Sequence, residues 1–585
     1  MLTYRKDIDG LRAIAILAVI CFHYGWFPGG YLGVDVFIVI SGYLITGIIY
    51  IATEANSFSL IKFYQRRIAR IIPLLLFISL TALVIGTVVM LPDDLENLSE
   101  SVFATNLFSN NILQLITTRN YWDVVNDFKP LLHTWSLGLE EQYYLFFPFL
   151  FLLVGGKKIN WIGPLLIILS IISLVLFLSG HFSHEARYYL LPFRFFEFSA
   201  GGMGAIFFRN RLVKNNLTPL LIIGLIVLMQ LPLKFLPFSI GIPFAAMLSF
   251  GIIISAGAAG GLTAMILENK VMVFIGRISY SLFMWHQVIL VFTRYFIVQH
   301  FSYACAALML LTTFLLSLFT YYFIEQPFRM RMKANPNRVL LILASAFIFI
   351  TGAAFYVYMH AGVLRNVPEL DINEADAGFN LHGKYNARVF QFNKPFTDTG
   401  KIKVLVIGNS FARDWVNVLL ESPFSSKISL SYTENATTGK DMESRMKLAD
   451  YIFYSDIAKE SLFHQLARYS GLDTSKIYCV GLKNFGVSNG VFYNHKHDPG
   501  YCMQRAVVEK VYLDRNNLLK KQWSGRYINL LESVIDGNGT VPVFTTDCKF
   551  ISQDCRHFTK AGAQYFAELV SSVPVIHNLA LRTEK

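Results

Sequence analysis

The chain has 585 residues, of which 54% are hydrophobic and 15% charged, with a net charge of +12 and a mean hydropathy of +0.46. This composition is far too apolar for an ordinary soluble protein and predicts a membrane protein. The positive charge comes largely from Lys and Arg in the loops on one side of the predicted membrane segments, so it does not indicate nucleic-acid binding.

Apolar runs long enough to cross a bilayer occur up to about residue 359. We predict a polytopic α-helical domain over residues 1–330, with about ten spans, and a linking span within 331–360. The eleven candidate spans lie at about 8–28, 31–50, 71–91, 136–154, 161–179, 189–208, 217–232, 239–259, 278–298, 303–323 and 339–359. The first run lacks a small-x-small cleavage site and a second span follows at once, so we expect it to be retained.

The distribution of Lys and Arg predicts the orientation. Most of them fall in the loops on the side of Met1, whereas the opposite loops carry Arg119, Lys129, Arg187 and Lys234. The positive-inside rule therefore places Met1 in the cytoplasm, and an odd number of spans places the C-terminal domain outside it.

Arg12 and His23 share the apolar run IDGLRAIAILAVICFH. Eleven steps of about 100° come to roughly three turns plus 20°, so both side chains lie on one helical stripe, roughly 16 Å apart along the axis. With Arg12 at one membrane surface, we expect His23 near the midplane, where an ionisable residue is costly and indicates function. A hydrogen-bonded packing histidine is the alternative interpretation.

A neutral His23 needs a partner that sets which ring nitrogen carries the proton. Three acids in or beside apolar runs are candidates: Asp35 in GGYLGVDVFIVISGYL, and Glu140 and Glu141 in HTWSLGLEEQYYLFFP.

The segment KFYQRRIARIIP places Arg66, Arg67 and Arg70 at the predicted cytoplasmic mouth of the third span. Forked guanidinium donors match phosphate and carboxylate groups, which predicts a clamp for such an anion. Anchoring against lipid headgroups is the simpler alternative.

Five motifs in order, DIDGLRAIAILAVICFH, PGGYLGVDVFIVISGYLIT, FYQRRIARIIP, HTWSLGLEEQYYL and ISYSLFMWH, closely resemble the membrane acyltransferase family 3 over about residues 4–330. Known members of that family move acetyl or other acyl groups from cytoplasmic acyl-CoA to sugars outside the membrane. By this resemblance, Arg12 and His23 form the family's Arg-x10-His pair, and Arg66, Arg67 and Arg70 its RRxxR motif. The resemblance implies that the Arg residues hold the phosphates of acetyl-CoA. His23 then acts as a general base on a sugar hydroxyl or accepts the acyl group transiently.

Residues 361–400 are polar and predict an exported linker, and residues 401–585 an α/β domain. In KIKVLVIGNSFARDWVNVLLES, a buried-strand pattern leads through a sharp turn into helical spacing. This order places Ser410 at the tip of a strand-to-helix turn, where helix N-terminal amides stabilise an oxyanion. Further on, Asp554 and His557 precede a helix that Thr559 can cap. Serine, acid and histidine are what nucleophilic catalysis requires.

The order strand–GNS–helix, then D-x-x-H before a closing helix, resembles the SGNH (GDSL-like) hydrolase family, which implies a flavodoxin-type α/β fold. By that resemblance Ser410 is the nucleophile, His557 the base and Asp554 its partner. Asn409 departs from the family's GDS motif, and no clean GxN block supplies the side-chain oxyanion donor. Gly439 in NATTGK and Asn484 in GLKNFG are the candidates. A degenerate domain that only binds sugar is the alternative.

The cysteines of the exported part lie where disulfides can form. Cys548 and Cys555 bracket a short step that can close a hairpin-like loop, which leaves Cys479 with Cys502, although sequence alone allows three connectivities. The spacing is not that of a zinc finger, so we expect no metal site and no permanently bound cofactor.

The fusion of the two modules resembles bacterial O-antigen O-acetylases of the inner membrane. It implies a multi-pass O-acyltransferase with a cytoplasmic N-terminus and a periplasmic C-terminal domain. Its expected partners are the lipid bilayer, acetyl-CoA, and a lipid-linked or surface polysaccharide such as lipopolysaccharide O-antigen. A transporter or flippase is one alternative, but we see no internal repeat of the kind that many transporters carry. A periplasmic carbohydrate esterase on an inert membrane anchor is the other, and it leaves the register of Arg12 and His23 unexplained.

Overall fold

The computed structural model describes residues 4–117, 126–154, 156–209, 217–257, 260–297, 301–398, 400–434, 440–456, 464 and 473–584. Arg119 and Gly439, named above, lie outside these residues. The chain forms two compact units. Unit 1 comprises Met1–Gly86, Asn97–Arg294 and Gln299–Phe355, and unit 2 comprises Thr87–Glu96, Tyr295–Val298 and Tyr356–Lys585.

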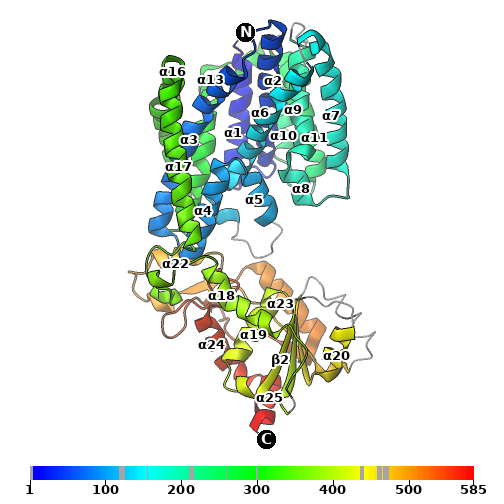
Figure 1. The fold of residues 1–585 in the computed structure, drawn as a ribbon, viewed down its shortest axis with the longest axis vertical. Coiled ribbons are helices and arrows are strands. Elements are labelled where there is room, and N and C mark those ends of the chain that lie inside the picture. Colours follow the sequence, from blue (N-terminus) through cyan, green and yellow to red (C-terminus); the bar gives the residue numbers. More distant parts are fainter. Residues whose placement is uncertain are drawn as a thin grey trace. The chain divides into compact units, whose positions relative to one another are not determined.

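Unit 1 is built from helices, many of which run side by side (Figure 1). The helices up to the end of the last apolar run are α1 (Lys6–His23), α2 (Gly33–Glu54), α3 (Leu60–Val89), α4 (Pro92–Asn106), α5 (Asn110–Thr117), α6 (Trp135–Val154), α7 (Ile162–Leu178), α8 (His184–Tyr189), α9 (Leu191–Phe207), α10 (Thr218–Leu228), α11 (Phe238–Ala256), α12 (Leu262–Leu267), α13 (Lys270–Arg277), α14 (Ser279–Arg294), α15 (Tyr303–Thr320), α16 (Gln326–Ala334) and α17 (Pro336–Met359).

Seven described helices are long and apolar enough to cross a membrane, or eight if the bent pair α13 and α14 is one span. This finding supports a multi-pass membrane protein. Helix α1 has several charges near its start, and α10 has only 11 residues. The count of eleven spans and the orientation therefore stay predictions.

Close packing of α2 against α9 depends on glycine. A Cβ atom at Gly42 would lie 2.0 Å from the carbonyl oxygen of Phe198, and one at Gly201 would lie 1.9 Å from that of Val39. Small residues of this kind let helix backbones approach each other in membrane proteins, which here packs the helix that carries Asp35 against the one that carries Arg194.

Unit 2 contains a five-stranded parallel sheet in the order β2-β1-β3-β4-β6. This order is the flavodoxin-type one, in which ligands bind beyond the carboxyl ends of the strands. The strands are β1 (Ile402–Gly408), β2 (Ile428–Thr433), β3 (Tyr451–Ser455), β4 (Ile477–Val480) and β6 (Tyr527–Ile528), with β5 (Arg505–Val507) and β7 (Thr540–Pro542) as a separate antiparallel pair. The helices are α18 (Leu381–Ala387), α19 (Ser410–Glu421), α20 (Lys440–Leu448), α22 (Asn489–Asn494), α23 (Lys510–Trp523), α24 (Lys560–Leu569) and α25 (Pro574–Glu584).

The stretch expected to be a linker contains the short helix α18 and contributes side chains to the core of unit 2. Val367 and Val389 are fully buried in the same cluster as Val404 and Trp415. These contacts arise between residues far apart in the sequence, and the low periodicity of the stretch gives no sign of them.

Candidate active sites

A sharp turn between β1 and α19 presents Ser410. Gly408, the last residue of β1, has φ +139°, and a Cβ atom there would lie 2.3 Å from the carbonyl oxygen of Ser455 on β3. Asn409 caps α19, because its side-chain oxygen accepts the backbone N–H of Phe411 at 3.0 Å. Ser410 therefore begins a helix, as the sequence predicted, and it is 5% exposed.

Ser410, His557 and Asp554 form a hydrogen-bonded chain. The Oγ atom of Ser410 lies 2.9 Å from Nε2 of His557, and Nδ1 of His557 lies 2.5 Å from Oδ2 of Asp554. The second oxygen of Asp554 accepts the backbone N–H groups of Arg556 at 3.0 Å and His557 at 2.7 Å. Burial disfavours the Asp554 carboxylate, but the charge and hydrogen bonds of His557 outweigh it and hold the pKa of Asp554 below its ordinary value. This is the geometry of a serine nucleophile, a base and an orienting acid.

Asn489 positions the loop that carries Asp554. Its side-chain amide donates to the carbonyl oxygens of Ser552 at 2.5 Å and Gln553 at 2.9 Å, and it is 4% exposed. The predicted cap of the following helix is also present, since Thr559 accepts the N–H of Gly562 at 3.0 Å. The sequence identified the cap but missed Asn489, because only the three-dimensional fold brings it to this loop.

Lys483 lies buried behind the candidate nucleophile. Its Nζ atom is 2.7 Å from Oδ2 of Asp414, and both side chains are 1% exposed. The ammonium also lies over the rings of Phe411, at 3.9 Å, and Phe558, at 4.7 Å, which directly follow Ser410 and His557. Burial lowers the pKa of Lys483, and Asp414 acts against this effect.

The side chain of Asn484, the predicted oxyanion donor, makes hydrogen bonds to Gly486 and Glu509. Its amide donates to the carbonyl oxygen of Gly486 at 3.1 Å and to Glu509 at 3.2 Å, and its oxygen accepts the backbone N–H groups of both residues. The assignment of Asn484 to an oxyanion hole is therefore wrong, because its hydrogen-bonding groups fix a loop. Gly439 lies outside the described residues.

A cavity of about 370 Å³ adjoins the Asp554–His557 pair within unit 2. Its lining includes the hydrogen-bonding side chains of Tyr385, Asn386, Gln553 and Lys560. This volume and these hydrogen-bonding groups suit a small polar ligand.

His382, at the edge of this cavity, lies 2.9 Å from Oδ1 of Asp93 and 3.7 Å from Oε2 of Glu96, and its Nε2 lies 2.7 Å from the carbonyl oxygen of Ala361. Together these three side chains have ligand atoms that a metal ion could bind. Burial acts against the imidazolium, but Asp93, Ala361 and Glu96 outweigh it and raise the pKa of His382 to about 9. The imidazolium thus supplies the positive charge that the two acids require.

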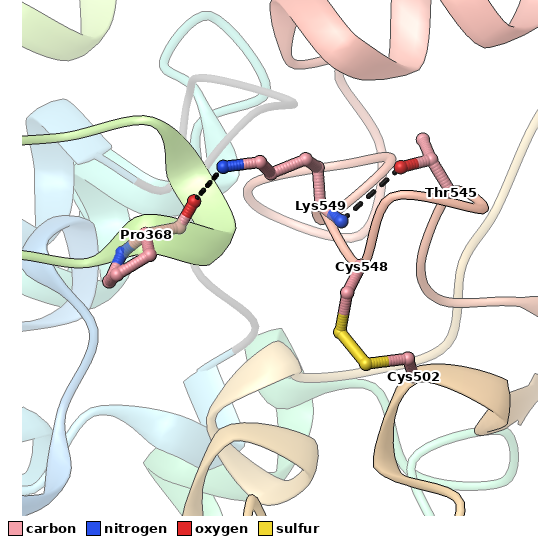
Figure 2. Close-up of a disulfide and its surroundings, with 5 residues drawn as sticks. All are labelled: Pro368, Cys502, Thr545, Cys548 and Lys549. Atoms are coloured by element: carbon pink, nitrogen blue, oxygen red, sulfur yellow. Dashed lines mark hydrogen bonds between the residues drawn. A yellow bond between two sulfur atoms is a disulfide. The ribbon is translucent and has the colours of Figure 1, made fainter.

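The disulfide of unit 2 joins Cys502 to Cys548 (Figure 2). Cys479 and Cys555 are both buried, and neither belongs to this bridge. Both predicted pairings, Cys548–Cys555 and Cys479–Cys502, are wrong, because the fold brings together cysteines that are 46 positions apart. Next to the bridge, Lys549 donates through Nζ to the carbonyl oxygen of Pro368 at 2.6 Å, and its backbone N–H donates to Thr545.

In unit 1, a narrow cavity of about 80 Å³ collects cationic side chains from separate helices. Arg12 of α1 and Arg67 and Arg70 of α3 line it, whereas Arg66 is exposed and does not. The structure therefore divides the predicted RRxxR cluster and adds Arg12 to two of its members.

Glu140 of α6 lines the same cavity. Its Oε2 atom accepts the hydroxyl protons of Ser41 at 3.0 Å and Tyr144 at 2.7 Å. Among the described residues no hydrogen bond joins it, or its neighbour Glu141, to His23. The predicted pairing of these acids with His23 is therefore wrong.

Asp35 of α2 has a different partner from the one predicted. It forms an ion pair with Arg194 of α9, which also pairs with Glu197, and all three side chains are buried. A buried guanidinium needs both acids, so Asp35 serves Arg194 and not His23. The residues Arg194 and Glu197 lie in an apolar run, and that pattern was the only available signal for them.

His23 ends α1, and its ring lies 5.2 Å from that of His286 on α14. The ring of His133 also lies 5.2 Å from that of His286. Arg12 and His23 lie on this one helix, eleven residues or roughly 16 Å apart along its axis, and the midplane position of His23 stays a prediction.

The N-terminal, helical part of the chain is similar to known proteins. Residues 5–320 match the family model described as an acyltransferase domain, Acyl_transf_3. Over 353 residues, 56% of this chain, it is 32% identical to a putative O-acetyltransferase of Staphylococcus aureus strain MSSA476. It is 31% identical, over 352 residues, to the O-acetyltransferase OatA of strain NCTC 8325. The chain spans 57% of the length of each relative, and no solved structure matches it. Because the family model covers more than half of the chain, the protein belongs to the family of membrane-type acyltransferases defined by this domain.

Proposed function

We propose that this protein is a membrane O-acetyltransferase that moves an acetyl group from cytoplasmic acetyl-CoA across the bacterial inner membrane to hydroxyls of a surface glycan. One observation carries the two-stage form of the proposal. A chain of the acyltransferase family also holds a Ser410–His557–Asp554 hydrogen-bonded chain, at 2.9 and 2.5 Å. The names of the relatives, O-acetyltransferases, support the acetyl group as the cargo.

In the first stage, the guanidinium groups of Arg12, Arg67 and Arg70 bind the donor. These three guanidinium groups line one cavity of about 80 Å³, and their forked donors match the phosphates of acetyl-CoA. His23 then acts as the base for an attacking hydroxyl, or accepts the acetyl group itself.

In the second stage, Ser410 receives the acetyl group. His557 takes the proton from Oγ as the oxygen attacks the carbonyl carbon, and Asp554 stabilises the imidazolium that forms. The leaving group takes that proton. A sugar hydroxyl, deprotonated by His557, then attacks the carbonyl carbon of the acetyl-serine. The bond from that carbon to Oγ breaks, and His557 returns the proton to Oγ, which restores Ser410. The backbone N–H of Ser410, at the start of α19, is placed to stabilise the oxyanion.

Unit 2 is, in this proposal, an SGNH-like domain in the periplasm. Its parallel strand order and its disulfide support that assignment, since disulfides persist in oxidising compartments. The acceptor is a lipid-linked or surface polysaccharide such as lipopolysaccharide O-antigen, for which the cavity of about 370 Å³ beside His557 offers hydrogen-bonding groups.

A membrane-anchored carbohydrate esterase is the second candidate, because the serine–histidine–aspartate geometry also suits hydrolysis. It predicts that the protein removes acetyl groups from a glycan and does not need acetyl-CoA.

The deciding experiment compares surface glycans by mass spectrometry in cells with and without the gene, and with His23→Ala or Ser410→Ala at matched protein levels. We expect an acetyl mass increment only with the wild-type protein. Normal acetylation in His23→Ala would remove the membrane stage. Normal acetylation in Ser410→Ala would mean that the membrane domain acylates the sugar directly. More acetyl groups without the gene would identify the esterase.

A further inference from the structure

Three histidines from distant parts of the chain meet inside unit 1. They are His23 at the end of α1, His133 in the one-turn helix Leu132–Thr134 before α6, and His286 in α14. The rings of His23 and His133 each lie 5.2 Å from that of His286. No role was predicted for His133 or His286 from the sequence.

The hydrogen bond of His286 fixes its tautomer. Its Nδ1 atom lies 2.6 Å from the carbonyl oxygen of Phe283. A carbonyl oxygen only accepts, so Nδ1 carries the hydrogen, and in the neutral ring Nε2 then has a free lone pair. His286 is fully buried, and its Nε2 has no hydrogen-bond partner among the described residues.

An unsatisfied buried acceptor is costly, by roughly 1–3 kcal/mol, so a nearby donor is expected to use it. The ring of His23 is one of the two imidazoles that contact His286. At a centroid separation of 5.2 Å, rotation of the His23 ring alone can bring one of its nitrogens toward Nε2 of His286, while Nδ1 of His286 keeps its bond to Phe283.

None of the three acids predicted to orient His23 hydrogen-bonds to it among the described residues, and two of them have other partners. Asp35 pairs with Arg194, and Glu140 accepts hydrogen bonds from Ser41 and Tyr144. A neutral imidazole can accept the N–H of the His23 ring, as a carboxylate would, without the cost of a second charge inside the membrane.

We propose that His286 is the positioning residue of His23, with Nε2 of His286 accepting the N–H of the His23 ring. This inference rests on the proposed role of His23. This hydrogen bond places the hydrogen of the neutral His23 ring on one nitrogen. The other nitrogen of His23 then acts as the base on the attacking hydroxyl. That nitrogen takes the proton of the attacking hydroxyl as its oxygen bonds to the thioester carbon. The C–S bond breaks, and the thiolate recovers the proton from His23.

The test uses the full-length protein in membranes and measures acetyl transfer and CoA release from acetyl-CoA. His286→Leu should lower kcat by roughly 10- to 100-fold with little change in the KM for acetyl-CoA. His286→Gln should keep more activity, because its amide oxygen lies near the position of Nε2. Gln287→Leu, at the next buried position of α14, is the matched control and should stay near the wild-type rate.

Chemical rescue separates an oriented base from packing. Imidazole added to His286→Ala should restore transfer, whereas pyrrole, which has the same shape but no basic nitrogen, should not. Equal rescue by both compounds, or a wild-type rate in His286→Leu, would overturn the inference. So would a normal His286→Leu rate combined with a lost rate in His133→Leu, which would give the role to His133. Retained transfer in His23→Ala would overturn the proposed function itself and this inference with it.

Discussion

The Oγ atom of Ser410 lies 2.9 Å from Nε2 of His557, although 147 positions separate the two residues in the chain. The contact joins the start of α19 to the loop before α24. A serine that only begins a helix does not need a histidine at hydrogen-bond distance, so this relationship favours a nucleophile over a structural serine.

Members of a working triad act as a unit. Ser410→Ala and His557→Ala should each lower acetyl transfer to glycan by about 10³-fold or more, and the double variant should be scarcely worse than either one. Ser426→Ala, at an exposed position after the same helix, is the control. Multiplicative losses in the double variant would show that the two residues act separately.

The two arginines of α3 should behave differently. Arg70→Ala removes a guanidinium from the cavity of unit 1, so the KM for acetyl-CoA should rise about tenfold or more in transfer assays. Arg66→Ala, which changes an exposed side chain, should leave that KM near the wild-type value. Equal effects of the two changes would mean that the cluster contacts lipid headgroups and not the donor.

His382 should make the stability of unit 2 depend on pH. Its pKa is raised to about 9 in the folded protein, against about 6.5 in the unfolded chain. Its stabilisation is therefore fully present below about pH 6.5 and is lost as the pH rises through 9. His382→Gln should lower the free energy of unfolding by up to roughly 3 kcal/mol at pH 6.5 and by little at pH 9.5.

Melting temperatures at the two pH values measure this difference. His497→Gln, at an exposed position, provides the control. A His382→Gln deficit of the same size at both pH values would contradict an imidazolium held by Asp93.

Lys483→Met should leave the Asp414 carboxylate buried without its cation, at a cost of about 3–5 kcal/mol in the free energy of unfolding. Adding Asp414→Leu removes the unpaired charge and should recover much of this loss. Thermal unfolding of the three proteins tests the coupling. A double variant that is no better than Lys483→Met would show that packing, and not charge, sets the cost.

Mass mapping under non-reducing conditions should find Cys502 joined to Cys548. The bridge closes a loop of about 46 residues, so its removal by Cys502→Ser should cost about 4 kcal/mol. Cys479→Ser should leave the bridge intact. Recovery of a Cys548–Cys555 peptide would contradict the structure and restore the pairing expected from spacing.

Local sequence signals predicted local structure well. The strand, turn and helix around Ser410 and the cap at Thr559 depend on residues within a few positions, and the structure has them as expected. The apolar runs likewise predicted membrane-length helices, since a span needs only length and apolarity.

Partnerships across the fold could not be read from the sequence. Asp35 pairs with Arg194 from another helix, Asn489 holds the Asp554 loop, and His286 approaches His23. Sequence spacing shows which residue types occur but not which helices pack together. The predicted cysteine pairing was wrong for the same reason. It was based on closeness along the chain, whereas the disulfide depends on closeness in space.

The order of the cysteines along the chain has a consequence for the biogenesis of the protein. If unit 2 is exported from its N-terminal side, Cys479 and Cys502 reach the oxidising compartment before Cys548. An oxidase acting on the emerging chain therefore meets the wrong pair first, and a bond between them has to be exchanged before Cys502 can reach its native partner. Maturation of this protein should then depend on a disulfide isomerase as well as on an oxidase, and a host that lacks one should accumulate a misbridged form.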